Sequence, residues 1–301
     1  MKYFFGVDIG GTNIRIGVMD ENHQLIKIIK KSSKDIKSNE DLINKIIELY
    51  NEVSEYPCSA LGIGVCGPCN VSEGYAYFIP NMNLVDVHFT DKLKEYINCP
   101  IYIGNDANVA GLCEALMGAG KGKSIVQYIT ISTGVGGGLF VNGHLVTGDY
   151  GFAQEIGHIK IKDSDEKLSS FTSAGSLESL CSGSALTRRA NKMGVKASHA
   201  GEVFNCTDPV CKGLVEEFIQ NFAEVLVNIT YFIEPSIIVI GGGVAKSFAF
   251  FGEALNRRYN ELIFPPLKDK IRIVKAEYDQ DTGILGACLL GEYYLSKTID
   301  K

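Results

Sequence analysis

The chain has no excess of basic residues over acidic ones, and this balance limits the kinds of partner it can bind. Among 301 residues, 29 are Lys or Arg and 35 are Asp or Glu, a formal net charge of −6. This argues against non-specific binding to nucleic acid or to an anionic membrane surface. Long apolar runs are lacking too, since none approaches the ~20 residues that span a bilayer. The first residues, with an acid at position 8 and no cleavage-like stretch, predict a strand and not a signal peptide.

A disulfide framework is also lacking. The nine cysteines are scattered, and an odd number in a long chain suits a reducing cytoplasm, where most would be small core residues. Residues 66–69, CGPC, do have the C-x-x-C spacing of thioredoxin-like redox sites. In such sites the motif opens a helix that lowers the pKa of the first thiol, whereas residues 70–74, NVSEG, predict a turn. We therefore expect a cytoplasmic protein in which Cys66 and Cys69 have no redox role.

The chain has enough apolar residues for a well-packed core. Hydrophobic residues make up 46% and charged residues 21%, and the length allows one large or two medium domains. No low-complexity linker is present, but residues 118–123, GAGKGK, predict a loop between two halves. We expect a small lobe over 1–117 and a large lobe over 118–284, with a C-terminal helix over about 285–301 as a candidate to pack on the small lobe.

Apolar periodicity predicts a mixed α/β fold. Ser38 is a predicted helix N-cap, and Asn142-Gly143 between apolar residues predicts a hairpin. The expected strands are 3–9, 14–19, 60–65, 101–103, 124–132, 237–240 and 271–274. One expected helix starts near residue 38. The other expected helices cover 91–97, 106–117, 176–193, 209–233, 245–262 and 281–296.

Three apolar strands are each followed by a glycine-rich loop. They lie at 5–18 (FGVDIGGTNIRIGV), 128–140 (YITISTGVGGGLF) and 237–243 (IIVIGGG). A loop of backbone N–H groups with few side chains can approach a phosphate closely. One such loop can be an ordinary bend that packs two strands, but three predict a nucleotide held between two halves of the molecule.

Two aspartates are candidates for chemistry. Asp106 follows a predicted strand at the start of a helix, where it could take a proton from an attacking hydroxyl or could merely cap the helix. Asp8 lies within an apolar strand, where an acid without a role is rare. Near phosphates it could hold Mg²⁺ through water, and the alternative is an acid at the edge of a plain β-turn.

The motifs occur in the order found in one family. DIGGTNIRIG, GVCGP, IGNDAN, STGVGGG, EIGH, SLESLCSG and IGGG, over about residues 3–290, resemble the ROK family of sugar kinases. The resemblance implies the actin-like fold shared with hexokinase, ribonuclease H-like in its core, with two α/β lobes around a cleft. It also implies ATP and Mg²⁺ as cofactors and a hexose as substrate.

The resemblance also implies roles for individual residues. Asp106 would be the catalytic base, and Asp8 would contact Mg²⁺ through water. The implied sugar-binding residues are Gly67, Asn81, Asn105, Asp106, Glu155, His158 and Glu178. For His158, the alternative to sugar binding is the role of an ordinary structural histidine. The implied nucleotide-binding residues are Asp8, Gly10, Gly11, Thr12, Asn13, Thr133, Gly134, Gly136, Gly137, Gly242 and Gly243.

One departure from the family concerns a structural zinc. Many members follow EIGH with three cysteines that bind zinc together with the histidine. Here the aligned positions hold Ser169, Phe171 and Ser176, none of which is a plausible zinc ligand. We therefore expect no structural zinc, with His158 available for sugar contacts and Phe171 replacing the metal by packing.

The sequence predicts an ATP-dependent kinase that phosphorylates the 6-hydroxyl of glucose or a close epimer or derivative. D-allose kinase and N-acetylmannosamine kinase remain alternatives, because one hydrogen bond separates epimers. A sugar-responsive repressor is disfavoured, since the first glycine loop begins at residue 8 and leaves no room before it for a DNA-binding domain. A non-catalytic sugar-binding protein would be expected to lose Asp106 or a phosphate loop. A homodimer is a further candidate.

Overall fold

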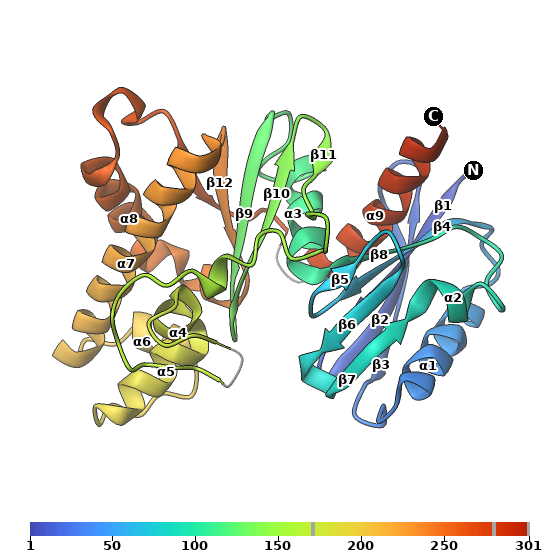
Figure 1. The fold of residues 1–301 in the computed structure, drawn as a ribbon, viewed down its shortest axis with the longest axis horizontal. Coiled ribbons are helices and arrows are strands. Elements are labelled where there is room, and N and C mark those ends of the chain that lie inside the picture. The colour runs from blue at the N-terminus through green and yellow to red at the C-terminus, as the bar shows by residue number, and fades with distance from the viewer. Residues whose placement is uncertain (170–171, 279–280, 300–301) are drawn as a thin grey trace. The chain divides into compact units, whose positions relative to one another are not determined.

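The computed structural model describes residues 1–169, 172–278 and 281–299, and these form two compact units (Figure 1). Unit 1 comprises Met1–Cys113, Leu145–Ala153 and Gln280–Lys301. Unit 2 comprises Glu114–His144 and Gln154–Asp279. In the part of the chain described, no helix combines the length and apolarity needed to cross a membrane.

Unit 1 is built on a five-stranded sheet with the order β3-β2-β1-β4-β8. Its strands are β1 (Tyr3–Ile9), β2 (Asn13–Asp20), β3 (Leu25–Ser32), β4 (Cys58–Val65) and β8 (Ile101–Asn105). β1, β4 and β8 are parallel, and the register aligns Ile9 with Val65 and Val65 with Asn105. The carboxyl ends of these three strands therefore meet at one edge of the sheet, where α/β proteins place their ligand-binding loops.

The two faces of this sheet are covered differently (Figure 1). Helix α1 (Asn39–Asn51) packs the side chains of Leu42, Ile46 and Leu49 against Phe5 and Val7 in the core. Helix α9 (Thr282–Ile299) packs on the other face, where glycines of β1, β2 and β4 let its backbone come close. A Cβ added at Gly62 would lie 1.9 Å from the carbonyl oxygen of Ala287. This helix contact therefore depends on glycine.

A smaller sheet completes unit 1, with the order β5-β6-β7. Its strands and the short helices near it are β5 (Cys69–Asn70), β6 (Tyr75–Ile79), η1 (Pro80–Met82), β7 (Leu84–His88) and α2 (Phe89–Leu93). Asn81 is part of η1, which directly follows β6, so this small sheet carries one of the predicted sugar-binding residues.

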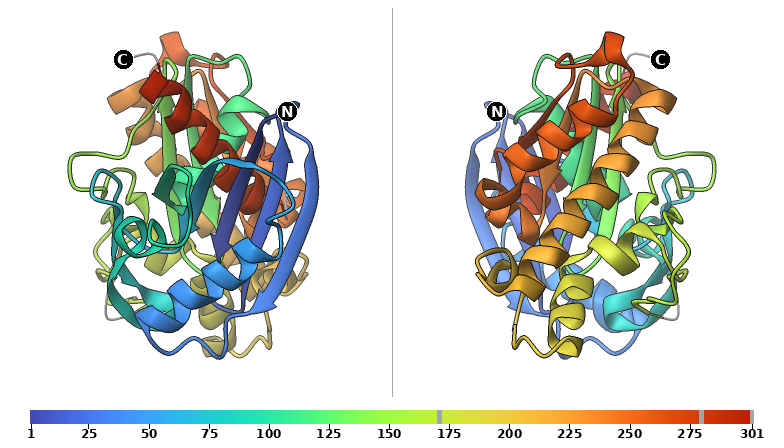
Figure 2. Two further views of the ribbon diagram at one scale, coloured as in Figure 1. Left: turned by 90° about the vertical axis from the view of Figure 1, so that its right-hand side faces the viewer. Right: turned by 90° about the vertical axis from the view of Figure 1, so that its left-hand side faces the viewer.

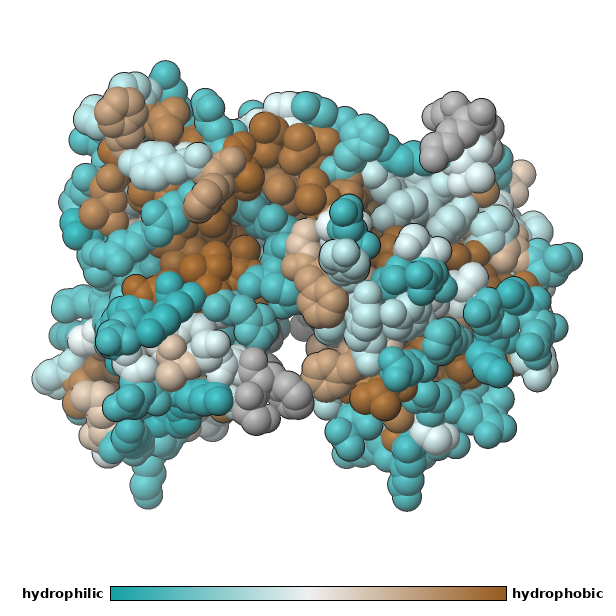
Figure 3. All heavy atoms as spheres, in the orientation of Figure 1, coloured by the Kyte–Doolittle hydropathy of each residue, from teal (hydrophilic) through white to brown (hydrophobic). Residues whose placement is uncertain are grey.

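Unit 2 has a second five-stranded sheet, with the order β11-β10-β9-β12-β13, which lies among the helices of this unit (Figure 2). Its core is rich in phenylalanine. Its strands are β9 (Ile125–Ile131), β10 (Val135–Val141), β11 (His144–Leu145), β12 (Ile237–Gly241) and β13 (Arg272–Lys275). Its helices are η2 (Ile156–His158), α4 (Leu177–Cys181), α5 (Gly183–Lys192), α6 (Ala200–Phe204), α7 (Pro209–Ile233), η3 (Gly243–Ser247), α8 (Phe248–Leu262) and η4 (Pro265–Leu267). Apolar side chains gather over the part of unit 2 where α7, α8 and β12 lie (Figure 3). Helix α3 (Asp106–Leu116) runs from unit 1 into unit 2.

Several local predictions are confirmed. Ser38 caps α1 by accepting a hydrogen bond from the backbone N–H of Asp41, and the predicted helix over 209–233 has those bounds. Asn142 and Gly143 have φ values of 49° and 83°, as a two-residue type I′ hairpin turn requires.

Four local predictions are wrong in detail. The predicted helix over 176–193 breaks at Ser182, which has extended backbone and caps α5 with its hydroxyl. The helix predicted over 245–262 begins as the 3₁₀ helix η3 and becomes α-helical only at Phe248. The helix predicted over 91–97 is the shorter and earlier α2, Phe89–Leu93. Gly136 and Gly137 lie inside β10 and not in a loop, because Gly137 packs against the backbone of Gln154 and the side chain of Ile156.

The packing of α9 gives a prediction about stability. Gly62→Ala should lower the free energy of unfolding by about 3 kcal/mol or more, because its methyl group overlaps backbone atoms that cannot move independently. Gly213→Ala is the matched control: Gly213 is exposed within α7 and has open space around its Cβ, so alanine should stabilise by roughly 0.5–1 kcal/mol. Urea unfolding of both variants measures the contrast, and wild-type stability in Gly62→Ala would contradict this account of the packing.

Candidate functional site

The first candidate group lies in unit 1, at the end of β1. Asp8 is directly opposite Arg15 in the β1–β2 register. The Oδ2 atom of Asp8 accepts hydrogen bonds from Arg15 Nη2 at 2.6 Å and Nε at 3.0 Å. Both side chains are mostly buried, with 21% and 22% of their surface exposed. The acid predicted to be near phosphates therefore has a cationic partner that sequence reasoning did not identify.

The loop after β1 is tightly turned. The N–H of Gly10 donates to the carbonyl of Asn13 at 2.9 Å, and the hydroxyl of Ser33 donates to the carbonyl of Gly10 at 3.0 Å. A Cβ at Gly11 would lie 3.0 Å from the Cβ of Asn81. The predicted phosphate loop, which includes Thr12, therefore lies against the predicted sugar-binding residue Asn81.

Asn105 and Asp106 follow β8 at the start of α3. Asn105 Oδ1 accepts from the N–H groups of Ala107 and Asn108, and its Nδ2 donates to the carbonyl of Gly67 at 3.1 Å. Asp106 Oδ1 accepts from the N–H of Ala107 at 2.8 Å. The capping function thus belongs largely to Asn105. Asp106 is the first residue of α3.

Cys66 belongs to this group, although sequence reasoning considered it only as part of a redox motif. Asn81 Nδ2 donates to Cys66 Sγ at 3.2 Å. Burial raises the pKa of the Cys66 thiol, and the neighbouring charge of Asp106 raises it further. Unit 1 therefore brings together Gly67, Asn81, Asn105 and Asp106 around this thiol.

The second candidate group lies in unit 2. Glu178, near the start of α4, accepts a hydrogen bond at Oε2 from the N–H of Val135 at 2.8 Å. A Cβ at Gly134 would lie 2.3 Å from that same oxygen. Glu155 directly precedes η2 and His158 is its last residue, with 3.9 Å between Glu155 Oε2 and His158 Nε2. Burial raises the pKa of Glu155, His158 opposes this, and the charge of Glu178 adds to it.

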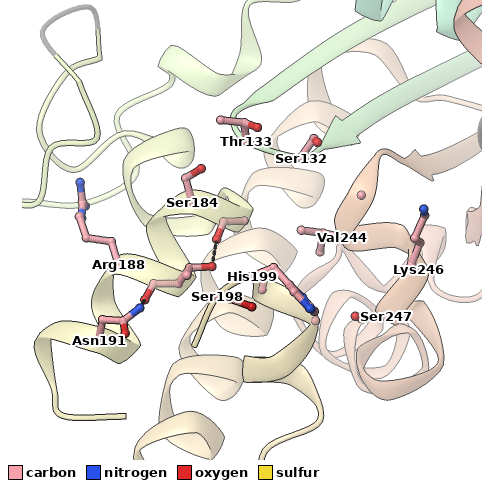
Figure 4. Close-up of a pocket in the computed structure, with 15 residues that line it drawn as sticks. Ser132, Thr133, Ser184, Arg188, Asn191, Ser198, His199, Val244, Lys246 and Ser247 are labelled. Carbon is pink, nitrogen blue, oxygen red and sulfur yellow. Dashed lines mark hydrogen bonds between the residues drawn. The ribbon is translucent and has the colours of Figure 1, made fainter. Parts of the chain in front are cut away.

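A cavity of about 630 Å³ opens in unit 2 beside the predicted nucleotide loops, within the range of small-molecule sites. Figure 4 shows Ser132 and Thr133 at the end of the strand pair, Arg188 and Asn191 on α5, and Lys246 near Ser247. Gly243 also lines it, and Gly242 precedes it with φ 82°, where a Cβ would lie 2.5 Å from the carbonyl oxygen of Ile131. Arg188, Asn191, His199 and Lys246 were not predicted as site residues.

The segment aligned with the family's zinc motif does not fit a metal. The hydroxyl of Ser176 is buried, donates to Ser179 Oγ at 3.0 Å and accepts from the Ser179 N–H at 3.3 Å as the cap of α4. The N–H of Ser169 donates to the hydroxyl of Thr172. Within residues 1–169, 172–278 and 281–299, no cluster of three or more His, Cys, Asp or Glu could hold a metal ion. The expectation for Phe171 falls outside the described residues.

The environment of Glu155 predicts a pH-dependent stability. The pKa of Glu155 is higher in the folded state than its ordinary value of 4.5. The contribution of this group to the free energy of unfolding is therefore fully present below pH 4.5 and is lost as pH rises through the folded-state pKa. Glu155→Gln should therefore raise the unfolding temperature at pH 7 and leave it nearly unchanged at about pH 4. The effect should be small, because 37% of the side chain is exposed. The exposed Glu95→Gln is the control, and an equal shift at both pH values would contradict the assignment.

Comparison with known proteins relates these two groups to a family. The ROK family model matches residues 4–293. A glucokinase from Thermotoga maritima is 28% identical over 302 residues, which cover 94% of this chain and 95% of that protein. A xylose repressor from Bacillus spizizenii is 26% identical, and the match covers 98% of this chain and 76% of the repressor.

A solved structure extends the likeness to the fold. The ROK family glucokinase from Streptomyces griseus, in complex with glucose and AMPPNP, is 28% identical, with a TM-score of 0.79 over 96% of this chain and 99% of that chain. The predicted actin-like, hexokinase-type α/β fold is thereby confirmed. With the family model matched over nearly its whole length, this chain belongs to the ROK family.

Proposed function

We propose that this protein is a sugar kinase that transfers the γ-phosphoryl group of ATP to a hexose, most favourably to the 6-hydroxyl of glucose or a close epimer. The observation that carries the proposal is the position of Asp106, a carboxylate at the N-terminus of α3 beside Asn105, Asn81 and Gly67. Family membership and the glucokinase relatives support the same reading.

Asp106 would act as the general base. Phosphoryl transfer depends mainly on holding the attacking hydroxyl in line with the γ-phosphorus. A carboxylate within hydrogen-bond reach can then take the hydroxyl proton. Asp106 stands at the start of α3, directly after the β8 residue Asn105, so its position in the chain is fixed by a strand and a helix. The side chain of Asn105 is fixed by α3 and by Gly67, so it is suited to orient the sugar.

The nucleotide would be held by two loops and the cavity. In unit 1, Gly11, Thr12 and Asn13 would offer backbone N–H groups, while Gly10, whose N–H already donates to the carbonyl of Asn13, would shape the turn. Thr133 and Gly134 would offer N–H groups in unit 2. Gly242, Gly243 and the cavity beside them suit the adenosine.

A magnesium ion bound with ATP would neutralise phosphate charge. Mg²⁺ keeps several waters and needs few protein ligands. Since the Arg15 bonds are to Asp8 Oδ2, a water-mediated contact fits this carboxylate better than direct ligation.

The sugar would contact Glu155, His158 and Glu178 in addition to the unit 1 residues. Carboxylates and imidazole provide the donors and acceptors that sugar hydroxyls need. D-Allose and N-acetylmannosamine remain alternative substrates. Assembly as a homodimer and location in the cytoplasm stay predictions.

A sugar-responsive repressor is the second candidate, favoured by the xylose repressor among the relatives. A repressor needs sugar binding but no proton acceptor or phosphate loops. This chain keeps Asp106 and the glycine loops at 10–11 and 132–134, which favours the kinase.

The activity itself is tested by coupled measurement of ADP release over a panel of glucose, mannose, allose and N-acetylmannosamine. We expect ATP- and Mg²⁺-dependent turnover with the highest kcat/KM for glucose, and little ADP release without sugar. A panel without turnover, together with sugar binding detected by thermal shift, would favour the repressor. A highest kcat/KM for allose or N-acetylmannosamine would keep the kinase and replace the substrate.

Asp106→Asn tests the proposed base. The amide keeps the shape but cannot accept the proton, so kcat should fall by about 10³-fold or more while sugar still shifts the unfolding temperature. Asp163→Asn, at a fully exposed carboxylate, is the matched control and should keep wild-type turnover. Near-normal kcat in Asp106→Asn would remove this residue from the role of base.

A further inference from the structure

Two cysteines that are distant in sequence have their thiols in contact. Cys58 opens β4, and Cys99 lies just before β8, the next strand of the same sheet. Their sulfur atoms are 3.4 Å apart, although the residues are separated by 41 positions. Adjacent strands lie about 4.8 Å apart, and disulfides bridge Cα atoms separated by about 4.4–6.8 Å. The contact between the two sulfur atoms is the observation that makes a disulfide feasible here, since the bond itself needs a separation of about 2.05 Å.

Neither Cys58 nor Cys99 is fully buried. The hydroxyl of Tyr50 is within hydrogen-bonding reach of both. The hydrogen bond between Cys99 and Cys58 lowers the pKa of Cys99, burial raises it, and the hydrogen bond with Tyr50 lowers it further. The same contact raises the pKa of Cys58. Cys99 is therefore the thiol that ionises first, and Cys58 is its neutral neighbour.

The other close cysteines are less suited to oxidation. In the CGPC motif, Cys66 Sγ accepts from Asn81, and buried Cys69 donates to the carbonyl of Gly67 at 3.3 Å. The pKa of Cys66 is raised, which disfavours its reactive thiolate. Cys211 contacts Cys206, but it is buried and its pKa is raised to about 11.

We propose that Cys58 and Cys99 form a reversible disulfide when the protein meets a peroxide. The Cys99 thiolate attacks one peroxide oxygen, the O–O bond breaks, and hydroxide leaves to give a sulfenic acid. The sulfur of Cys58, losing its proton, attacks the sulfenic sulfur, the S–O bond breaks and water leaves. The two thiols are oxidised by two electrons and the peroxide is reduced to two waters. A dithiol restores both thiols by exchange.

This disulfide would fasten the amino ends of β4 and β8. It closes a long loop in the unfolded chain, which favours the folded state. Asp106 follows the opposite end of β8, so the modification lies away from the proposed catalytic base. The proposal does not depend on the proposed function, and its test uses no activity measurement.

The test treats the folded, reduced protein with hydrogen peroxide in slight excess, then alkylates free thiols and maps disulfides by mass spectrometry. We expect loss of two hydrogen atoms, a Cys58–Cys99 linked peptide, and reversal by dithiothreitol. The oxidised protein should unfold about 5 °C higher than the reduced protein. An unchanged or lower unfolding temperature would overturn the fastening effect.

Two sets of variants make the assignment specific. Cys58→Ser and Cys99→Ser should each abolish the linked peptide, and Cys58→Ser should leave Cys99 trapped as a sulfenic acid that reacts with dimedone. The double variant Cys66→Ser/Cys69→Ser, which removes the motif, should still form the disulfide. A first disulfide that maps to Cys66–Cys69 or Cys206–Cys211 overturns the proposal. So does equal alkylation of Cys58 and Cys99 before and after peroxide in the wild-type protein, a measurement that needs no variant to fold.

Discussion

The close approach of α9 to the sheet of unit 1 is the contact on which this unit depends. Gly6, Gly17 and Gly62 have no side chains to separate helix from strands, and added Cβ atoms there would lie within 1.9–2.7 Å of α9 atoms. The opposite face is then free to bury the apolar side chains of β1, β2 and β4 against α1. Held from both faces, the parallel strands keep the register that aligns Ile9, Val65 and Asn105. This register brings the glycine loop, Gly67 and Asp106 to one edge.

Two carboxylates at one edge would repel each other and an incoming triphosphate, and each has a different positive partner. Asp8 is held by the guanidinium of Arg15, and Asp106 accepts a hydrogen bond from the backbone N–H of Ala107 at the start of α3. Arg15 also lies 3.6 Å from Asp281, just before α9. The guanidinium of Arg15, the partner of Asp8, carries a full positive charge that can attract phosphate. The partner of Asp106 is a backbone N–H group, which leaves the carboxylate able to accept a proton, so the surroundings of the two acids are consistent with their proposed roles.

Much of the fold follows from local rules in the sequence. The cap at Ser38, the Asn142-Gly143 turn and the helix Pro209–Ile233 were predictable because each depends on neighbouring residues. The Asp8–Arg15 pair was predictable too, since a hairpin around Gly10–Thr12 sets them opposite each other. The bond from Val135 to Glu178 joins residues 43 apart, and only the folded chain reveals it. The break at Ser182 was missed because residues on both sides favour helix, and the capping hydroxyl decides between one helix and two.

The cysteines show that the positions of thiols in the folded sheet indicate their reactivity better than a short sequence motif does. CGPC continues from the carboxyl end of β4, so Cys66 is placed beside Asn81 and Asp106. Burial, and then the negative charge of Asp106, raise the pKa of this thiol and favour its protonated form. A protonated thiol is a poor nucleophile and does not compete with a base beside it. At the amino ends of β4 and β8 there is no such carboxylate among the groups that shift the pKa of Cys99, and Cys58 and Tyr50 lower it. The two ends of this parallel sheet therefore differ in chemistry. The carboxyl ends of β4 and β8 lead to the acids and amides proposed to bind a sugar, and the amino ends bring together the thiols of Cys58 and Cys99, which are 41 positions apart in the sequence.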